Sequence, residues 1–364
     1  MKLLVPFLVV MTMTASAQKA TGLHRELDSV FLSYFRADEP GGAVLIGTGD
    51  RVIYKNGFGV ADLGTREPVT TRTLFNLGSI SKTFVGFGIL KLEEEGLLSL
   101  SDPLNRYFNF RHGEVVKDIR LHHLLTHTSG LPDIRKVQEK REFYITAKDA
   151  ENWAPILETD SLHFQPGTRY KYSNPAFNAL ALIIEQLTRN KWQEYIRDKI
   201  FVPSGMQTST ITDGPHPEAG VSHGYILNGR GEFEELDYGE EPTFAAAGNG
   251  GVWSSVEELW AYEQAIRNNV FLAPSMVAQA RSVRKPVNWQ GGQDPIVGYS
   301  WFITRDSGIA VIGHTGSQGG FIGDYCWLPE KNVFYVLLCN IPRPIREIRS
   351  RVFDLLSRRN WKLD

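Results

Sequence analysis

The chain has 364 residues, of which 42% are hydrophobic and 22% are charged, and its net charge is −2. This is the composition of a globular protein with enough apolar residues for a large core. Such a small net charge gives no basic field for nucleic acid or for an anionic membrane surface, so we expect neither as a partner.

The first residues predict an export signal. Lys2 provides a positive start, residues 3–12 are apolar, and Ala-Ser-Ala at 15–17 is a small-residue cleavage site. We expect a signal peptide at 1–17 and a bacterial protein that is periplasmic or secreted. The apolar run is too short to span a bilayer and has no cysteine nearby for a lipid, so we expect no stable membrane anchor.

Hydrophobic periodicity predicts strands at both ends of the chain and helices between them. A helix at 21–36 precedes strands at 42–47 and 51–57, which the turn 48–50 joins. A buried helix of about 17 residues then ends at Gly96, and residues 211–250, rich in Gly and Pro, predict extended loops. The other expected elements are helices at 175–189, 192–201 and 345–358, and strands at 299–304, 309–313, 319–328 and 332–340.

Short hairpin connections predict an antiparallel sheet built from both chain ends and flanked by helices, which is an α+β fold of the α/β/α sandwich type. We expect one domain at 18–364. Its sheet lobe comprises 18–75 and 252–364, and 76–251 form an inserted, mainly helical lobe. A cleft between such lobes is a usual place for a small-molecule site.

The only two cysteines, Cys326 and Cys339, lie in one predicted hairpin with its turn at 329–332. Counting outward from the turn, Cys326 faces a residue at 334–336, and Cys339 lies about four residues further out, which is too far for a disulfide. We therefore predict two buried free thiols.

The most informative pair is Ser79 and Lys82, in Phe75-Asn-Leu-Gly-Ser-Ile-Ser-Lys-Thr-Phe84. On a helix these positions share a face, and a buried lysine can lose its proton near neutral pH and then deprotonate the serine. Helix capping by the serine is the alternative interpretation. The same spacing at Ser282-Val-Arg-Lys285 lies in a polar stretch that predicts a solvated loop.

Tyr172-Ser-Asn174 precedes the predicted helix at 175–189. The tyrosine can carry a proton to a leaving group if nearby positive charge lowers its pKa, and Asn174 can bind both substrate and lysine. The pattern is common, since Tyr54-Lys-Asn56 and Tyr107-Phe-Asn109 also match it. We expect Tyr54 to pack in a strand and Tyr107 to lie in a polar loop.

Three smaller motifs each have a functional and a structural interpretation. His314-Thr315-Gly316 follows the strand at 309–313, where small residues let a substrate backbone approach; a β-turn with a surface histidine is the alternative. Gly248-Asn-Gly-Gly251 matches no phosphate-binding loop and predicts a close pass along a site wall. Three histidines cluster as possible metal ligands, but the zinc-protease glutamate is replaced by Leu124, so we expect structural histidines and no metal. They are His122, His123 and His127.

The ordered set of Ser-x-x-Lys, Tyr-x-Asn and His-Thr-Gly resembles the penicillin-recognising serine hydrolases. The nearest branch holds the class C β-lactamases, D,D-carboxypeptidases, D-aminopeptidases and β-lactamase-like esterases. The resemblance covers nearly the whole chain after residue 17 and includes segments without catalytic groups. These are 40–44, 57–62, 124–132, 201–206 and 298–301.

This resemblance implies a β-lactamase/D,D-peptidase-like fold that needs no metal or organic cofactor. It makes Ser79 the acylated nucleophile, Lys82 the acceptor of its proton and Tyr172 the acid or base at the leaving group. The backbone N–H groups of Ser79 and Ser317 would form an oxyanion hole, in which each donor is worth about 3 kcal/mol. The residues implied in substrate binding are Asn174, His314, Thr315 and Gly316.

One departure from the family pattern concerns the substrate. Most β-lactamases and penicillin-binding enzymes of this group carry lysine where this chain has His314, and histidine is largely neutral at pH 7, which weakens a carboxylate anchor. We therefore expect an exported serine hydrolase for an ester or a short, possibly D-amino-acid-containing, amide or peptide. The alternatives are a class C-type β-lactamase or D,D-carboxypeptidase for cell-wall peptides, and a catalytically silent binding protein of the same fold.

Overall fold

The computed structural model describes residues 22–135, 147–211, 220–236 and 247–361. The predicted signal peptide lies outside these ranges. Among the described residues, no helix is long and apolar enough to cross a bilayer.

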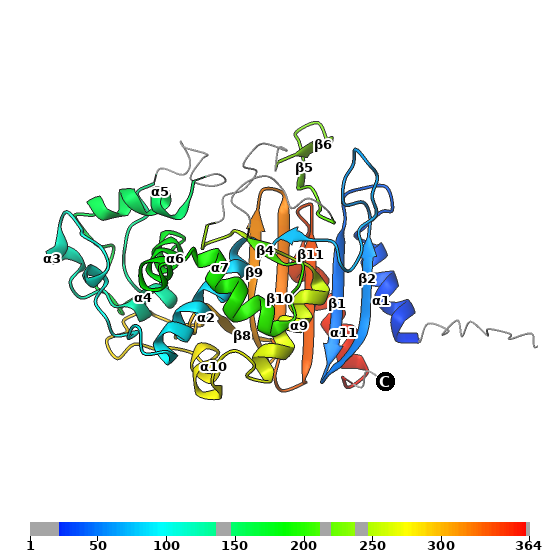
Figure 1. Cartoon of the computed structure of the whole chain (residues 1–364). Helices are drawn as coiled ribbons and strands as arrows, with labels where there is room; N and C mark the ends of the chain where they lie inside the picture. Colours follow the sequence, from blue (N-terminus) through cyan, green and yellow to red (C-terminus); the bar gives the residue numbers. More distant parts are fainter. Residues whose placement is uncertain (1–21, 136–146, 212–219, 237–246, 362–364) are drawn as a thin grey trace, which may run out of the picture.

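A six-stranded antiparallel sheet forms the centre of the molecule, with strand order β2-β1-β11-β10-β9-β8 (Figure 1). The two ends of the chain meet in the middle of this sheet, where β1 and β11 pair from Gly42↔Cys339 to Thr48↔Val333. The strands are β1 (Gly42–Thr48), β2 (Arg51–Phe58), β8 (Phe302–Asp306), β9 (Ile309–Gln318), β10 (Phe321–Leu328) and β11 (Val333–Cys339).

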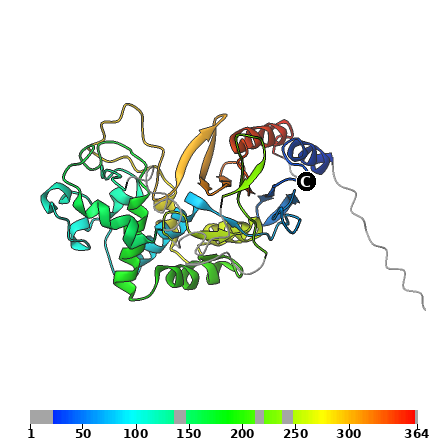
Figure 2. The same cartoon turned by 90° about the horizontal axis from the view of Figure 1, so that it is seen from above.

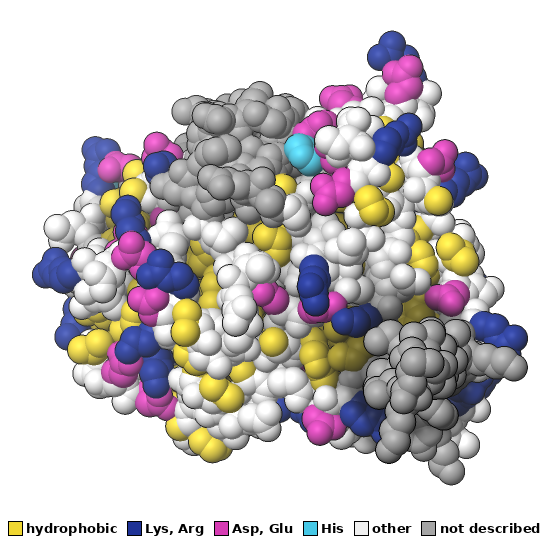
Figure 3. Space-filling view, turned by 45° about the vertical axis from the view of Figure 1, so that its right-hand side comes forward, with side chains coloured by type: hydrophobic (Ala, Val, Ile, Leu, Met, Phe, Trp, Pro, Cys, Tyr) yellow, Lys and Arg dark blue, Asp and Glu magenta, His cyan; other side chains and the backbone are white. Residues whose placement is uncertain are grey.

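Helices cover both faces of this sheet, so the predicted α/β/α sandwich is confirmed. On one face α1 (Gly22–Leu32) and α11 (Ile345–Arg358) lie side by side, as Figure 2 shows, and Tyr34 just after α1 donates a hydrogen bond to Glu347 of α11. On the other face lie α2 (Ser81–Glu94) and α9 (Val256–Arg267). Figure 3 shows acidic and basic side chains intermixed on the face that it presents, as the small net charge predicts.

The middle of the chain forms the mainly helical part. Its helices are α3 (Gly113–Val116), α4 (Leu121–Leu125), α5 (Asp149–Trp153), α6 (Pro175–Thr188), α7 (Trp192–Ile196) and α8 (Val202–Ser204), with a π-helical turn at Arg197–Phe201; α10 (Pro274–Ala280) follows α9. Small sheets join β3 (Phe75–Asn76), β7 (Val252–Ser254) and β4 (Thr210–Ile211), and β5 (Tyr225–Leu227) with β6 (Phe233–Glu235). The β5–β6 hairpin corrects the prediction that 211–250 holds only loops.

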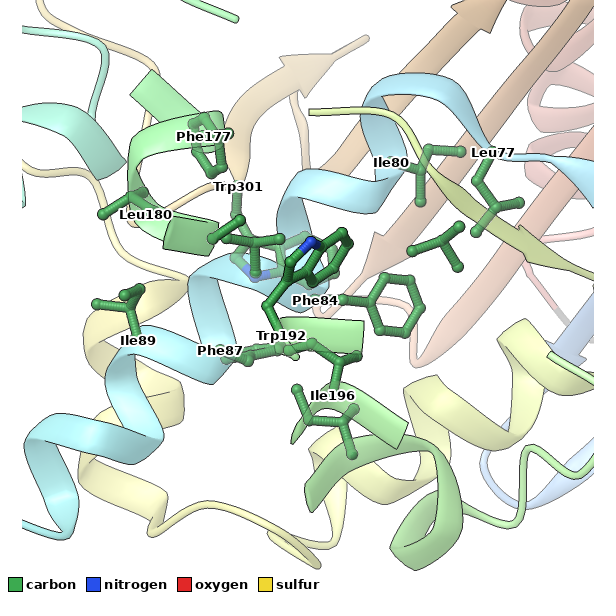
Figure 4. Packing of buried hydrophobic residues seen from close by; sticks show 14 of the residues in the cluster. Leu77, Ile80, Phe84, Phe87, Ile89, Phe177, Leu180, Trp192, Ile196 and Trp301 are labelled. Atoms are coloured by element: carbon green, nitrogen blue, oxygen red, sulfur yellow. The ribbon is translucent and has the colours of Figure 1, made fainter. Parts of the chain in front are cut away.

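The helix α2 is buried nearly all round, which explains its apolar sequence. Phe84 stacks on Tyr262 of α9 with ring centroids 4.2 Å apart, and Phe87 contacts Trp301 at 5.7 Å. Figure 4 shows Phe84 and Phe87 of this helix together with Trp192 of α7, and Leu77 and Ile80 just before the helix. A helix so tightly packed fixes the residues at its N-terminus within the core of the molecule.

Two expectations about the last strands need correction. β8 begins at Phe302 rather than at 299, and β9 does not end at Gly313 but continues to Gln318. Beyond Gly313, β9 pairs only with β10 on one side, because β8 pairs with Ile309–Gly313 alone. His314, Thr315 and Gly316 therefore lie within a strand whose other edge is free of β8.

The cysteine prediction is confirmed. Cys326 pairs with Tyr335, as the count from the turn indicated, while Cys339 pairs with Ile322 and Gly42. Both thiols are free and buried.

Candidate active site

Ser79 and Lys82 face each other at the N-terminal end of α2. Ser79 lies in a one-turn 3-10 helix, Gly78–Ile80, and not in the α-helix itself. In 3-10 geometry residues i and i+3 eclipse each other, which suits this contact. Lys82 Nζ is 3.1 Å from Ser79 Oγ, and Ser79 makes no capping hydrogen bond, since Leu77 and Ile80 occupy the N-cap positions. The capping interpretation of Ser79 is therefore wrong.

The amine of Lys82 is fully buried. Burial, together with the positive charge of Arg135, holds its pKa well below the usual value of a lysine. Its Nζ also donates to the carbonyl oxygen of Asn249 at 2.6 Å. Since a carbonyl can only accept, a neutral amine fixed in this way can turn its lone pair towards the Ser79 hydroxyl.

Tyr172 lies over the same pair. Its ring stacks on His127 with centroids 4.3 Å apart, and Lys82 Nζ lies 5.1 Å from the Tyr172 centroid. Burial raises the pKa of Tyr172, against a smaller lowering by the nearby Ser79 hydroxyl. The condition named from the sequence, a pKa lowered by nearby positive charge, is therefore not met, because burial dominates the pKa of Tyr172. Tyr172 is a protonated phenol, and within the described chain its hydroxyl has no regular hydrogen bond.

The segment 124–132 contributes directly to the site through His127, for which the sequence indicated only a structural role. Besides stacking on Tyr172, His127 accepts a hydrogen bond from the Ser173 backbone N–H at its Nδ1, 3.1 Å away. Burial, with Lys82 and His314 nearby, lowers the pKa of His127 well below its usual value. The ring is therefore a neutral support for the tyrosine. The sequence marked His127 only as one of three clustered histidines and as part of the 124–132 segment.

The other two histidines of this cluster have structural bonds, as predicted. His123 Nδ1 accepts from the Arg120 N–H at 3.0 Å, and His122 Nδ1 lies 3.0 Å from the carbonyl oxygen of Leu100. The described part of the chain holds no group of three or more His, Cys, Asp or Glu side chains able to bind a metal.

The predicted oxyanion donors lie on two segments that are packed closely together. A Cβ on Gly316 would lie 1.9 Å from the Leu77 carbonyl oxygen and 3.3 Å from Ser79 N, and one on Gly78 would lie 2.7 Å from Ser317 N. Only glycine fits at both contacts. The space predicted at Gly316 for a substrate backbone is instead filled by the segment that carries Ser79. This packing places the backbone nitrogens of Ser79 and Ser317 near each other.

His314 is buried, so the alternative of a surface histidine in a turn is wrong. Its Nδ1 lies 2.6 Å from the Thr315 carbonyl oxygen, so Nδ1 carries the proton and Nε2 is a bare acceptor. Nε2 is buried and has no partner among the described residues. Burial and Lys82 lower the pKa of His314 to about 3, so it carries no charge near neutral pH.

A cavity of about 1120 Å³ opens beside these residues and extends to the start of α11. Its lining includes Ser79, Tyr172, His314, Thr315, Gly316 and Ser317.

Asn174 occupies the N-cap position of α6 without a side-chain capping hydrogen bond. Within the described chain, Lys82 donates a hydrogen bond to Asn249 rather than to Asn174. The structure thus brings the other predicted site residues together, whereas the Asn174 side chain makes no hydrogen bond to Lys82 within the described residues.

Asn249 was missed by sequence reasoning as a partner of Lys82. It lies in Gly248-Asn-Gly-Gly251, which was expected to pass along a site wall, and the hydrogen bond to Lys82 supports that expectation. A backbone carbonyl leaves no signal in the sequence.

The second Ser-x-x-Lys motif, at Ser282, lies in an exposed loop. Its Lys285 forms an ion pair with Asp294 at 2.5 Å.

The tyrosines of the other two Tyr-x-Asn matches, Tyr54 and Tyr107, make structural hydrogen bonds away from this site. Tyr54 stacks on Phe31 and donates to Asp28 at 2.7 Å, and Tyr107 donates to Asp102 at 2.7 Å. Of the three Tyr-x-Asn matches, only Tyr172 lies beside the Ser79–Lys82 pair.

A family model described as Beta-lactamase matches residues 27–355, so the chain belongs to this family of serine hydrolases. A penicillin-binding protein of Bacillus subtilis is 27% identical over 315 residues, covering 82% of this chain and 67% of that protein. Protein flp of Staphylococcus aureus is 24% identical over 329 residues, covering 86% of this chain and 63% of its own length. The chain thus spans about two thirds of these relatives.

Solved structures share the fold. The octameric penicillin-binding protein homologue from Pyrococcus abyssi superposes with a TM-score of 0.80 at 27% identity, covering 92% of this chain and 77% of that one. The D-amino acid amidase from Ochrobactrum anthropi has a TM-score of 0.76 at 18% identity, covering 93% and 99%. The predicted family resemblance and fold are confirmed.

Proposed function

We propose that this member of the beta-lactamase family is an exported hydrolase that works through an acyl-enzyme on Ser79. The observation that carries the proposal is the buried amine of Lys82, which lies 3.1 Å from the Ser79 hydroxyl and whose pKa is held far below the usual value. A serine needs such a base before it can attack a carbonyl group.

The proposed reaction has two steps. Lys82 takes the Ser79 proton as Oγ attacks the substrate carbonyl, and the N–H groups of Ser79 and Ser317 bind the resulting oxyanion. Tyr172, which burial keeps protonated, gives a proton to the leaving group. Water then attacks the acyl-enzyme, and the same groups act in reverse order.

The substrate we propose is an ester or a short amide, including amides of D-amino acids. His314 supports this choice because its neutral ring presents an acceptor where a carboxylate would need a donor. A β-lactamase or D,D-carboxypeptidase is the second candidate, favoured by the penicillin-binding protein and the β-lactamase family among the matches.

Intact-mass spectrometry tests the acyl-enzyme. The wild-type protein is expected to gain the mass of one fluorophosphonate adduct and to turn over p-nitrophenyl esters or D-amino acid amides faster than nitrocefin or D-alanyl peptides. Ser79→Ala is expected to remain unlabelled, and Ser282→Ala, which changes the other Ser-x-x-Lys motif, is expected to label normally. A wild type without label or turnover, or a labelled Ser79→Ala protein, would contradict the proposal.

We also propose that residues 1–17 direct export. The protein recovered from the periplasm or medium of an expressing bacterium is then expected to begin at Gln18. A protein retained in the cytoplasm with residue 1 intact would contradict this.

A further inference from the structure

Asp149 is a buried carboxylic acid at the start of α5, and nothing in the sequence marked it. In the described part of the chain it has no ion pair, which is costly for a buried carboxylate unless hydrogen bonds replace water. Its Oδ1 accepts from Asn178 Nδ2 at 2.7 Å and from the Gly248 backbone N–H at 2.9 Å. The carboxyl group therefore connects three segments: α5, α6 and the loop at 247–251.

These bonds continue to the base of the proposed reaction. Asn178 Nδ2 also donates to Asn249 Oδ1 at 2.9 Å, and the Asn249 carbonyl oxygen accepts from Lys82 Nζ at 2.6 Å. When Asp149 is ionised its oxygen can only accept, which orients the Asn178 amide with Nδ2 towards it. Asp149 thus holds residue 248 directly and residue 249 through Asn178, and residue 249 holds the lysine.

We propose that Asp149 is a positioning residue for the acyl-transfer reaction: through Asn178 and the 248–249 backbone it fixes the carbonyl that orients the Lys82 amine towards Ser79. The inference rests on the proposed function. Its physical basis is that a base acts only when its lone pair faces the proton, and a displacement of about 1 Å can slow a reaction about a hundredfold. Asp149 itself touches neither substrate nor reacting atoms.

Because Asp149 can ionise, we expect the strength of its hydrogen bonds to Asn178 and Gly248 to depend on pH. Burial raises the pKa of Asp149 to about 7, against the hydrogen bonds from Asn178 and Gly248, and Glu185 of α6 adds to the increase. Trp192 of α7 acts in the opposite direction and lowers this pKa. An ionised carboxylate accepts hydrogen bonds more strongly than a protonated one, so the loop is held more firmly above pH 7 than below it.

The test compares acylation rates of Asp149→Asn and wild type, from the burst of p-nitrophenol released by p-nitrophenyl acetate at a series of pH values. Asparagine has nearly the same shape but cannot ionise. We expect the acylation rate of Asp149→Asn to fall about tenfold with little change in KM, and the ionisation near pH 7 to disappear from its pH profile.

Two variants separate positioning from folding. Asn249→Ala keeps the backbone carbonyl that binds Lys82 but removes the side chain that Asn178 holds. We therefore expect a similar loss of acylation rate. If Asp149→Asn does not fold, Asn249→Ala is the variant that tests the proposal. Glu151→Gln removes one negative charge from the same short helix at an exposed position, and its rate and pH profile are expected to match wild type.

The outcomes are distinct. A wild type that shows no burst and no fluorophosphonate label would overturn the proposed function itself. A labelled wild type, with folded Asp149→Asn and Asn249→Ala variants that keep its acylation rate and pH profile, would leave the function standing and overturn the role of Asp149. Variants that lose only thermal stability would likewise overturn that role.

Discussion

At the scale of single residues, the charge state of Lys82 decides whether the proposed reaction can proceed. A protonated amine cannot accept the Ser79 proton. Since burial and Arg135 lower the pKa of Lys82, the neutral form persists to lower pH than in an exposed lysine, and activity is lost as pH falls through the lowered pKa.

Replacing Lys82 with arginine tests this requirement, because a guanidinium stays charged at any working pH. We expect Lys82→Arg to slow acylation by about 10² to 10⁴ at every pH, measured by the rate of fluorophosphonate labelling. Lys91→Arg is the control, since Lys91 lies on the same helix but pairs with Glu94 at 2.6 Å. Near-normal labelling of Lys82→Arg would show that an uncharged base is not needed.

His314 is the residue on which substrate preference is expected to depend. His314→Lys places an ammonium group in the cavity beside Ser79, where it can bind a carboxylate. We expect KM for carboxylated substrates, such as D-alanyl peptides, to fall by about tenfold relative to uncharged esters, which corresponds to about 1.4 kcal/mol. An unchanged ratio of the two KM values would exclude a substrate contact at this position.

At the scale of elements, the packing of the Gly78–Ile80 turn against β9 is the contact that assembles the proposed oxyanion hole. In Gly316→Ala the added Cβ would lie 1.9 Å from the Leu77 carbonyl oxygen, so the turn and the strand must separate. We expect a loss of about 1–3 kcal/mol in unfolding free energy from overpacking. We also expect a loss of about 10²-fold or more in kcat if an oxyanion donor moves away.

Denaturant unfolding and steady-state kinetics measure the two effects. Gly113→Ala is the control, because a Cβ there has no neighbour within 4 Å. A Gly316→Ala protein with normal stability and kcat would show that the turn and strand tolerate separation.

Elements differed in how far the sequence could predict them. The helix α2 and the β1–β2 hairpin were predicted because long apolar runs and turn residues mark them clearly. The end of β9 was not predicted, because Thr315-Gly316 is typical of a turn. Here Gly316 instead lets the strand pack closely against the segment that carries Ser79. The 3-10 turn at Ser79 differs from an α-helix in its hydrogen bonding and its tighter winding, and neither is marked by residue composition.

Within the candidate site, sequence reasoning found the groups that we propose to react and missed those that we propose to position them. Ser79, Lys82 and Tyr172 belong to patterns in which residue type and spacing carry the chemistry. Asn249 acts through its backbone carbonyl, and Asp149 resembles any acidic residue in the first turn of a surface helix. Their burial depends on segments far apart in the chain, which no local pattern reveals.

At the scale of the whole molecule, buried neutral histidines link stability to pH. Burial lowers the pKa of His123 and of His314 to about 3, and it holds that of His127 well below its usual value. The unfolded chain binds these protons below about pH 6.5, so the stability that the neutral forms provide is present above pH 6.5 and is lost as pH falls towards the folded pKa values. Asp149 acts in the opposite sense, since its raised pKa costs stability as pH rises from about 4 to about 7.

Urea unfolding at pH 7 and pH 5 checks this balance. We expect the wild type to be less stable at pH 5, with each such histidine contributing about 1.4 kcal/mol per pH unit within its window. His123→Gln is expected to show a smaller difference between the two pH values. The exposed His112→Gln serves as the control. Equal pH dependence in His123→Gln and wild type would show that His123 is not held neutral.

The meeting of the two chain ends in one sheet also sets the order in which the protein can become active during synthesis. Ser79 leaves the ribosome early, but the nitrogen of Ser317 and the strand that carries it follow only after most of the chain, and β1 finds its partner β11 later still. Pairing over such long separations in sequence is slow and comes late in folding. In a partly made chain, Ser79 therefore has no Ser317 N–H opposite it, and the proposed acyl transfer requires that the last strands have paired.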